Sequence, residues 1–331
     1  MFCALFVLAG VGLPLAAQSL NAAGATFPSP IYQKWFAAYN GAHPQVRINY
    51  QDIGSGGGIR QLKEGTIDFG ASDMPMTDKQ IASMKVKPLH FPTVMGAVVL
   101  TYNIPGINSS LKLTPEALAG IYLGDIIKWN DPRLKSANPA AKLPNKDIIV
   151  VRRSDGSGTT FAFTEYLSKV SAAWKSKVGA NTSVSWPIGL GQKGSDGIAG
   201  MVKQTPNSIG YVELSFAVSN KMRVAELKNL AGNFVKPNLE SIVAAANAGG
   251  RIPSDLRLSI ENAAGPDSWP IATFTWLLIP SHFEDPAKGR AVAGFLRWML
   301  TEGQKTAPAL HYAPLPPLIV EAGQKQIARI Q

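Results

Sequence analysis

The sequence predicts an α/β protein with two lobes. Short apolar runs typical of buried strands alternate along the chain with amphipathic runs typical of helices, which favours largely parallel sheets flanked by helices. Two apolar runs, at 93–102 and 271–279, are long enough to cross from one lobe to the other. We therefore expect two mostly parallel sheets, hinged by these crossing strands, with a ligand cleft between the lobes.

The crossing strands divide the chain. Residues 20–97 and 275–331 are expected to form a discontinuous lobe 1, and residues 98–274 a continuous lobe 2. The length of 331 residues suits two domains of about 150 residues each.

The first 19 residues carry no charged side chain and are mostly apolar, as in the central region of a secretory signal peptide. Small residues precede a cleavage point after Ser19, so residues 1–19 are expected to be removed and the protein exported to the periplasm. A buried N-terminal helix is the alternative, which the glycines and proline of this stretch disfavour. The only cysteine, Cys3, lies in the leader, so we expect no disulfide or thiolate site.

The formal net charge of +10 would suit nucleic acid, an anionic membrane surface or a small anion. The lysines and arginines are scattered, and nowhere do five follow one another. We therefore expect a solvated basic surface and no nucleic-acid partner.

Lobe 1 is predicted to begin with a strand and turn at 22–28, followed by a helix that carries Ile31, Trp35 and Tyr39 and ends at Gly41. An alternating strand at 46–50, a helix at 59–64 that ends at Gly65, and a strand at 67–71 follow. The predicted elements of lobe 2 are a helix from Pro115 to about Gly124, a strand at 148–151, a helix at 160–170, a helix at 197–204 capped by Asp196, a strand at 209–212 and a helix at 238–248. After the second crossing strand, helices begin at Asp285–Pro286 and near Pro317.

A strand that turns through glycines and hydroxyls into a helix occurs three times, at 22–28, 54–58 and 151–160. Such a turn presents free N–H groups and the positive end of the helix dipole, which suits an anion. The third turn is the richest, because Arg153 is a rigid bidentate oxyanion donor and Asp155 can hold its other face. Simple capping by Ser157 is the alternative interpretation there, and a flexible turn is the alternative at 54–58.

Asp73 follows the strand at 67–71 and is the residue that bears on specificity. A carboxylate only accepts hydrogen bonds, so it favours an oxyanion that carries a proton, such as hydrogenphosphate, over sulfate. A buried acceptor left unpaired costs about 1–3 kcal/mol, and more when it is charged. An ordinary loop aspartate is the alternative.

Enzymatic and metal chemistry lack their signatures. Ser157 lies in Gly-Ser-Gly and not in G-x-S-x-G, and no histidine is local to a candidate nucleophile. The four histidines, His43, His90, His282 and His311, have no ligand spacing. We expect no catalysis, no metal and no cofactor. A phosphatase or phosphoryl-transfer enzyme, and a receptor for sulfate, molybdate or tungstate, remain as alternatives.

With these residues the chain resembles the periplasmic phosphate-binding proteins of the phosphate-specific ABC transporter. The resemblance covers nearly all of the chain after the leader. Its motifs include Gly-Ala-Thr-Phe-Pro at 24–28, Asp-Phe-Gly-Ala-Ser-Asp at 68–73, Val-Val-Arg-Arg at 150–153, Asp-Gly-Ser-Gly-Thr at 155–159 and Trp-Pro-Ile-Gly-Leu-Gly at 186–191.

The resemblance implies a two-lobed periplasmic-binding-protein fold of type II-like topology. It also implies a monomer that closes over dehydrated inorganic phosphate and delivers it to membrane permease subunits. Carried over by position, it implies a phosphate site made of Thr26, Phe27, Ser55, Asp73, Arg153, Ser157, Gly158 and Thr159, supported by Asp155. Asp73 would accept the phosphate proton, and Arg153 would make the charged contact.

Overall fold

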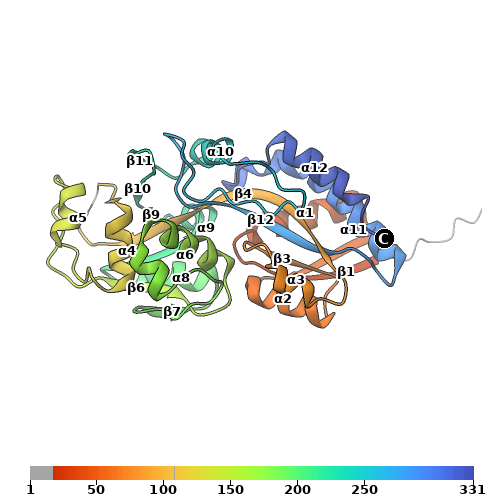
Figure 1. Cartoon of the computed structure of the whole chain (residues 1–331), viewed down its shortest axis with the longest axis horizontal. Helices are drawn as coiled ribbons and strands as arrows, with labels where there is room; N and C mark the ends of the chain where they lie inside the picture. Colours follow the sequence, from red (N-terminus) through yellow and green to blue (C-terminus); the bar gives the residue numbers. More distant parts are fainter. Residues whose placement is uncertain (1–17, 108) are drawn as a thin grey trace, which may run out of the picture.

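A computed structural model describes residues 18–107 and 109–331, which form two α/β lobes side by side (Figure 1). Most of the predicted signal peptide, with Cys3, lies outside the described residues. Gln18 and Ser19 are described, and they already pair with Val46 and Arg47 in the first strand of the sheet. The cleavage point after Ser19 stays a prediction.

Within the described residues, nine strands form one sheet, in the order β2-β1-β3-β12-β4-β8-β6-β7, with β9 also beside β4. Its strands are β1 (Gln18–Gly24), β2 (Val46–Gln51), β3 (Phe69–Ser72), β4 (Pro88–Asn103), β6 (Ile149–Arg153), β7 (Leu190–Gln192), β8 (Ser208–Glu213), β9 (Arg223–Val224) and β12 (Ala272–Pro280). A small sheet in lobe 2 has the order β11-β10-β5, from β5 (Lys112–Leu113), β10 (Glu226–Lys228) and β11 (Phe234–Val235).

Helices cover the sheet in both lobes (Figure 1). Lobe 1 carries α1 (Ser29–Ala42), α2 (Ser55–Glu64), α3 (Asp78–Ala82), α11 (Pro286–Met299), α12 (Pro317–Ile327) and the short 3-10 turns η1 (Gly303–Thr306) and η2 (Pro308–Leu310). Lobe 2 carries α4 (Pro115–Leu123), α5 (Pro132–Ala137), α6 (Gly158–Val170), α7 (Ala172–Lys177), α8 (Gly194–Gln204), α9 (Leu214–Ser219) and α10 (Leu239–Asn247). In the described part of the chain no helix is long and apolar enough to span a bilayer.

The long strand β4 belongs to both lobes. Its first part pairs with β12 as far as the register pair Ala97 and Ala272, and its last part pairs with β8 from Val98 onward. The returning chain lies against the same point, because the Val98 N–H donates to the Ile271 carbonyl at 2.9 Å and the Trp269 indole donates to the Val98 carbonyl at 3.0 Å. The two predicted crossing strands therefore lie side by side.

The pairs nearest the site are parallel, as the alternation of strands and helices predicts: β1 with β2 and β3, and β6 with β7 and β8. The pairs that involve the crossing strands are antiparallel, β12 with β3 and β4, and β4 with β8. The reason is that β4 leaves lobe 1 and β12 re-enters it, so they run in opposite directions.

Some predicted helix ends are wrong by a few residues. The helix expected at 59–64 begins at Ser55, so three glycines form its first turn, and α1 passes Gly41 to end at Ala42. Asp196 does not cap its helix, because α8 begins at Gly194, with Lys193 at the N-cap position. The Gly194 N–H is instead bound by Asp155, a partner that is 39 residues away in sequence.

Candidate functional site

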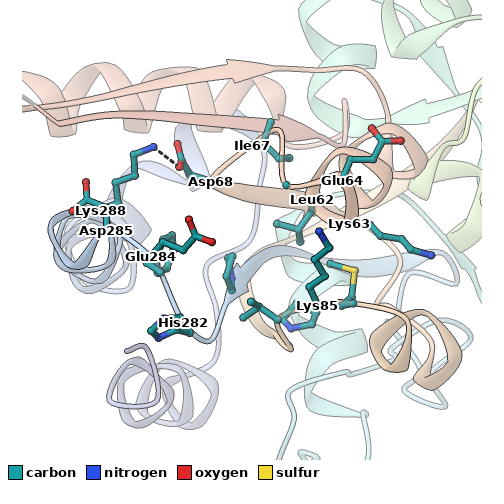
Figure 2. A pocket seen from close by; sticks show the side chains of 16 residues that line it. Leu62, Lys63, Glu64, Ile67, Asp68, Lys85, His282, Glu284, Asp285 and Lys288 are labelled. Atoms are coloured by element: carbon teal, nitrogen blue, oxygen red, sulfur yellow. Dashed lines mark hydrogen bonds and ion pairs between the residues drawn. The ribbon is translucent and has the colours of Figure 1, made fainter.

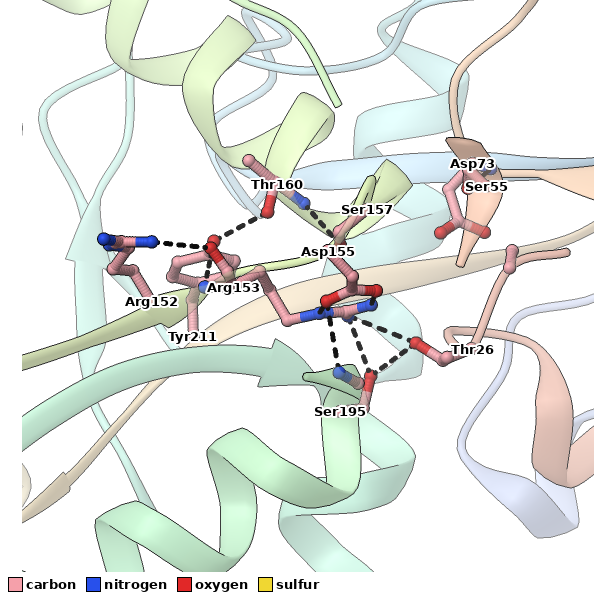
Figure 3. Close-up of polar contacts among 12 residues, drawn as sticks. Thr26, Ser55, Asp73, Arg152, Arg153, Asp155, Ser157, Thr160, Ser195 and Tyr211 are labelled. Atoms are coloured by element: carbon pink, nitrogen blue, oxygen red, sulfur yellow. Dashed lines mark hydrogen bonds and ion pairs between the residues drawn. The ribbon is translucent and has the colours of Figure 1, made fainter. Parts of the chain in front are cut away.

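The ends of three strands meet between the lobes. In lobe 1, Thr26 follows β1, Asp73 follows β3 and Ser55 begins α2. In lobe 2, Arg153 ends β6, and Ser157 is the N-cap of α6. Figure 3 shows the side chain of Arg153 reaching from lobe 2 towards Thr26 of lobe 1. These strand ends face one another because parallel strands bring their carboxyl ends to one edge of a sheet.

The guanidinium of Arg153 forms a bidentate ion pair with the carboxylate of Asp155. Its Nε donates to Asp155 Oδ1 at 2.6 Å, its Nη2 binds Asp155 Oδ2, and only 2% of the residue is exposed. Asp155 also accepts the Gly194 N–H at 3.2 Å. Burial raises the pKa of Asp155, but hydrogen bonds and charge from Arg153 outweigh it, so its pKa lies below the ordinary value. A bidentate pair of this kind fixes the plane of the guanidinium.

The remaining nitrogen of Arg153 joins the two lobes. Its Nη1 donates to the Thr26 hydroxyl at 3.1 Å and to the Ser195 hydroxyl at 3.5 Å, and these two hydroxyls lie 3.0 Å apart. Ser195 is on α8 in lobe 2 and is buried. A positive charge and two hydroxyls thus converge at the boundary between the lobes.

The start of α6 faces lobe 1. Ser157 Oγ accepts the Thr160 N–H at 3.1 Å, so the capping role weighed as an alternative is present. Thr159 Oγ1 is buried and has no hydrogen-bond partner. A Cβ added to Gly158 would lie 2.5 Å from Ser55 Oγ and 2.6 Å from Asp73 Oδ2. The first turn of α6 therefore lies so close to lobe 1 that there is no room for a side chain at Gly158.

Asp73 is a buried acceptor with one oxygen left over. Its Oδ1 accepts the Thr275 hydroxyl at 2.8 Å and its N–H donates to Ser55 Oγ at 3.1 Å, but its Oδ2 is buried without a partner. Burial raises the pKa of Asp73 to about 7, against the opposing effects of the Thr275 hydrogen bond and the Arg153 charge. The unpaired Oδ2 of Asp73 can accept one more hydrogen bond, and a ligand that carries a proton can donate it.

The glycine-rich turns at 54–58 and 154–158 contact each other through their main chains. The Gly56 N–H donates to the Gly156 carbonyl at 2.9 Å across the lobes. Gly54 has a φ of 87°, and a Cβ there would lie 2.7 Å from both Asp155 Oδ2 and the Gly156 carbonyl oxygen. Side chains larger than hydrogen would hold these turns apart.

Phe27 contributes its main chain to this region, since its ring is in the core. The ring is fully buried against Gly96, and its centroid lies 6.2 Å from that of Tyr312. Its carbonyl accepts the Tyr312 hydroxyl at 2.6 Å.

A separate cavity of about 510 Å³ lies at the other end of the lobe 1 strands (Figure 2). Its lining carries charges of both signs, and Lys288 donates to Asp68 there at 2.8 Å. None of the buried polar atoms that lack a partner belongs to a residue lining it. Two of these unpaired atoms, Asp73 Oδ2 and Thr159 Oγ1, lie instead where the two lobes meet.

The chain is similar to known phosphate-binding proteins over most of its length. A family model described as the PBP superfamily domain matches residues 13–302. The chain is 48% identical to the phosphate-binding protein PstS of Xylella fastidiosa over 304 residues, which cover 91% of this chain and 83% of that protein. It is 44% identical to the phosphate-binding protein PstS of Haemophilus influenzae over 324 residues, covering 97% and 96%. The chain belongs to the PstS family.

Solved structures carry the same fold as this PstS family member. A high-affinity periplasmic phosphate-binding protein solved with bound phosphate matches with a TM-score of 0.77 and 22% identity, over 93% of this chain and 94% of that chain. A phosphate-binding protein from Stenotrophomonas maltophilia matches with a TM-score of 0.72 and 18% identity, over 94% of each chain. The two-lobed periplasmic-binding fold expected from the sequence is confirmed.

In this PstS family member the predicted site residues converge from both lobes. Thr26, Ser55 and Asp73 meet Arg153 and the start of α6, as the preceding distances show. Sequence reasoning missed Ser195 and Thr275. Ser195 follows a short strand and a glycine, which is a fourth occurrence of the strand–turn–helix pattern, and so carried a usable signal. Thr275 lies inside a long strand and carried none.

No metal chemistry is indicated by this site. Among the described residues, no group of three or more histidine, cysteine, aspartate and glutamate side chains is placed to hold an ion. The arrangement consists of donors from hydroxyls, a guanidinium and a helix start, together with two carboxylates, of which Asp155 pairs with Arg153 and Asp73 keeps one oxygen without a partner.

Proposed function

We propose that this chain is a high-affinity receptor for inorganic phosphate that delivers phosphate to the permease of an ABC transporter in the cell envelope. The observation that carries the proposal is Asp73 Oδ2, which is buried without a partner among donors. Membership of the PstS family supports it independently.

The proposed phosphate ligands are the main chain or side chains of Thr26, Phe27, Ser55, Asp73, Arg153, Ser157, Gly158 and Thr159. Arg153, held in plane by Asp155, supplies the charge, and the start of α6 supplies N–H groups and its dipole. Asp73 accepts the proton of hydrogenphosphate. Sulfate has no proton to donate at neutral pH, so it would leave Asp73 unpaired and repelled.

The proposed movement is closure of two lobes, 20–97 with 275–331 and 98–274, about the point where β4 changes partner. The hydrogen bonds between Thr26 and Ser195 and between Gly56 and Gly156 belong to the closed form, because each joins opposite lobes. Opening would break them and release phosphate to the permease.

We propose that the protein binds phosphate without catalysing a reaction. Donors that bind the ground state tightly do not by themselves accelerate a reaction. We further propose that the protein acts as a periplasmic monomer. The family supports the location, since a structure of the same fold is described as a periplasmic phosphate-binding protein.

Titration calorimetry on ligand-stripped protein tests the proposal. Phosphate is expected to bind tightly and sulfate at least about 1,000-fold more weakly, the scale on which polar sites reject an analogue lacking a required group. Similar affinities for the two anions would contradict it. Saturable hydrolysis of a phosphoester by the same preparation would revive the phosphatase alternative.

A further inference from the structure

One tyrosine hydroxyl meets acceptors from both lobes. Tyr312 follows η2 in lobe 1 and is fully buried. Its Oη lies 2.6 Å from the Phe27 carbonyl oxygen in lobe 1 and 3.1 Å from Glu213 Oε2 in lobe 2. Glu213 ends β8 at the point where it pairs with β4, and it too is fully buried.

The number of protons decides how these contacts are made. A tyrosine hydroxyl has one proton to donate, and a carbonyl oxygen can only accept. The shorter contact, to Phe27, therefore takes the tyrosine proton. An ionised carboxylate also only accepts, so the contact between Tyr312 and Glu213 would then have no proton between its two oxygens. A protonated Glu213 supplies that proton.

The surroundings of Glu213 favour the neutral acid. Its Oε1 accepts the Ser215 N–H at 2.7 Å and its Oε2 faces the Phe216 N–H at 3.3 Å, both at the start of α9. The charged group that acts on it is Asp73, which is of the same sign. Burial raises the pKa of Glu213 well above its ordinary value, and its contacts with the Ser215 N–H, the Tyr312 hydroxyl and the Phe216 N–H offset this only in part.

We propose that Glu213 is a protonated positioning residue, which donates to the Tyr312 hydroxyl so that Tyr312 in turn holds the Phe27 carbonyl. This pair of hydrogen bonds fixes the Thr26–Phe27 turn of lobe 1 from lobe 2. It also leaves Asp73 as the one ionisable carboxylate of the site that can face the anion, without a second negative charge behind it. The inference rests on the proposed phosphate function of that turn.

Two substitutions separate the proton from the charge. Glu213→Gln keeps a donor for Tyr312, an acceptor for Ser215 and a neutral side chain. It is expected to bind phosphate within about threefold of the parent, with the same dependence on pH. Tyr312→Phe removes the hydroxyl that holds Phe27 and is expected to weaken phosphate binding about tenfold. Tyr102→Phe is the control, because its hydroxyl donates to Ser109 within lobe 2, away from the site.

Infrared difference spectroscopy reads the proton directly. The parent minus Glu213→Gln spectrum at neutral pH is expected to contain the C=O band of a protonated carboxylic acid. Carboxylate bands in that spectrum, or tighter phosphate binding by Glu213→Gln, would overturn the protonation. Unchanged affinity in Tyr312→Phe would overturn the positioning role. If the parent itself bound no phosphate in calorimetry, the proposed function would fail, while the infrared band would still decide whether Glu213 holds a proton.

Discussion

At the scale of single residues, the proposed selectivity depends on Asp73, a negatively charged acceptor in a site proposed for an anion. Asp73 is almost fully buried, and one of its oxygens is satisfied by Thr275 while the other is not. As proposed, Arg153 and the start of α6 would attract any oxyanion of suitable size. In the proposed site Asp73 would therefore discriminate by rejection, since an oxyanion without a proton leaves it unpaired.

Replacing Asp73 with asparagine is expected to reduce the preference for phosphate over sulfate. The amide can donate as well as accept, and it carries no charge, so sulfate is no longer repelled. We expect the ratio of the two affinities, measured by calorimetry, to fall by at least about tenfold. The exposed Asp196→Asn is the control for loss of one negative charge. An unchanged ratio in Asp73→Asn would refute the role of Asp73.

The raised pKa of Asp73 also predicts a pH dependence of stability in the ligand-free protein. Its pKa moves from an ordinary 3.8 to about 7 on folding, so between these values the folded state binds more protons than the unfolded state. Stability then falls as pH rises through this window. Urea unfolding at several pH values is expected to show this fall in the parent and a smaller fall in Asp73→Asn. Equal slopes in the two proteins would contradict it.

At the scale of elements, the recurring unit is a strand that turns through glycine and a hydroxyl into a helix. In α6 the unit combines a capping serine with a glycine that lies against the opposite lobe. The serine stabilises the start of the helix, whereas glycine has a lower helix propensity than alanine. Only glycine lets the start of α6 lie this close to Ser55 and Asp73, which explains a residue of low helix propensity at this position.

The substitution Gly158→Ala tests this closeness. The added methyl group would meet Ser55 and Asp73 only when the lobes are closed. We expect phosphate affinity to fall at least about tenfold, while the thermal midpoint of ligand-free protein stays the same or rises through the better helix propensity. Gly200→Ala on α8 is the matched control, because a Cβ there meets nothing within 4 Å. Equal affinities in the two variants would show that the contact does not matter.

Local patterns predicted the longer elements, but several short ones, such as α5, α7, α9 and β5, were not predicted. Tertiary contacts explain some of the errors in the predicted bounds. The caps at Thr114, Asn238 and Asp285 act within three residues and were readable from the sequence. The start of α8 could not be predicted from the sequence, because the Gly194 N–H donates to Asp155, which follows the distant strand β6. The same limit hid Thr275, whose role depends on β12 lying next to β3.

At the scale of the whole molecule, two lobes share one sheet and meet through glycine turns. The sequence predicted the crossing strands by their length. It could not predict that β4 would pair with different strands on either side of Ala97, because strand pairing is set by distant segments. The proposed closure would therefore be a bend within a continuous sheet.

Small-angle X-ray scattering tests closure. Phosphate is expected to lower the radius of gyration of the parent. Gly156→Ala is expected to reduce this compaction at saturating phosphate, because its Cβ would lie 3.1 Å from Gly56 Cα, which is main chain and cannot move aside. Gly41→Ala, whose Cβ meets nothing, should compact as the parent does. No change in the parent on adding phosphate would rule out the proposed movement.

The contact between Val98 and Ile271 has a consequence for how such proteins vary. The chain leaves lobe 1 and returns to it at residues joined by a hydrogen bond of 2.9 Å, from the Val98 N–H to the Ile271 carbonyl, and the Trp269 indole donates to the Val98 carbonyl at 3.0 Å. Lobe 2 is thus inserted into lobe 1 through two adjoining ends. An insertion with adjoining ends can lengthen, shorten or be exchanged without displacing the strands on either side of it. A change in the length of lobe 2 would therefore leave the lobe 1 sheet and Asp73 in place.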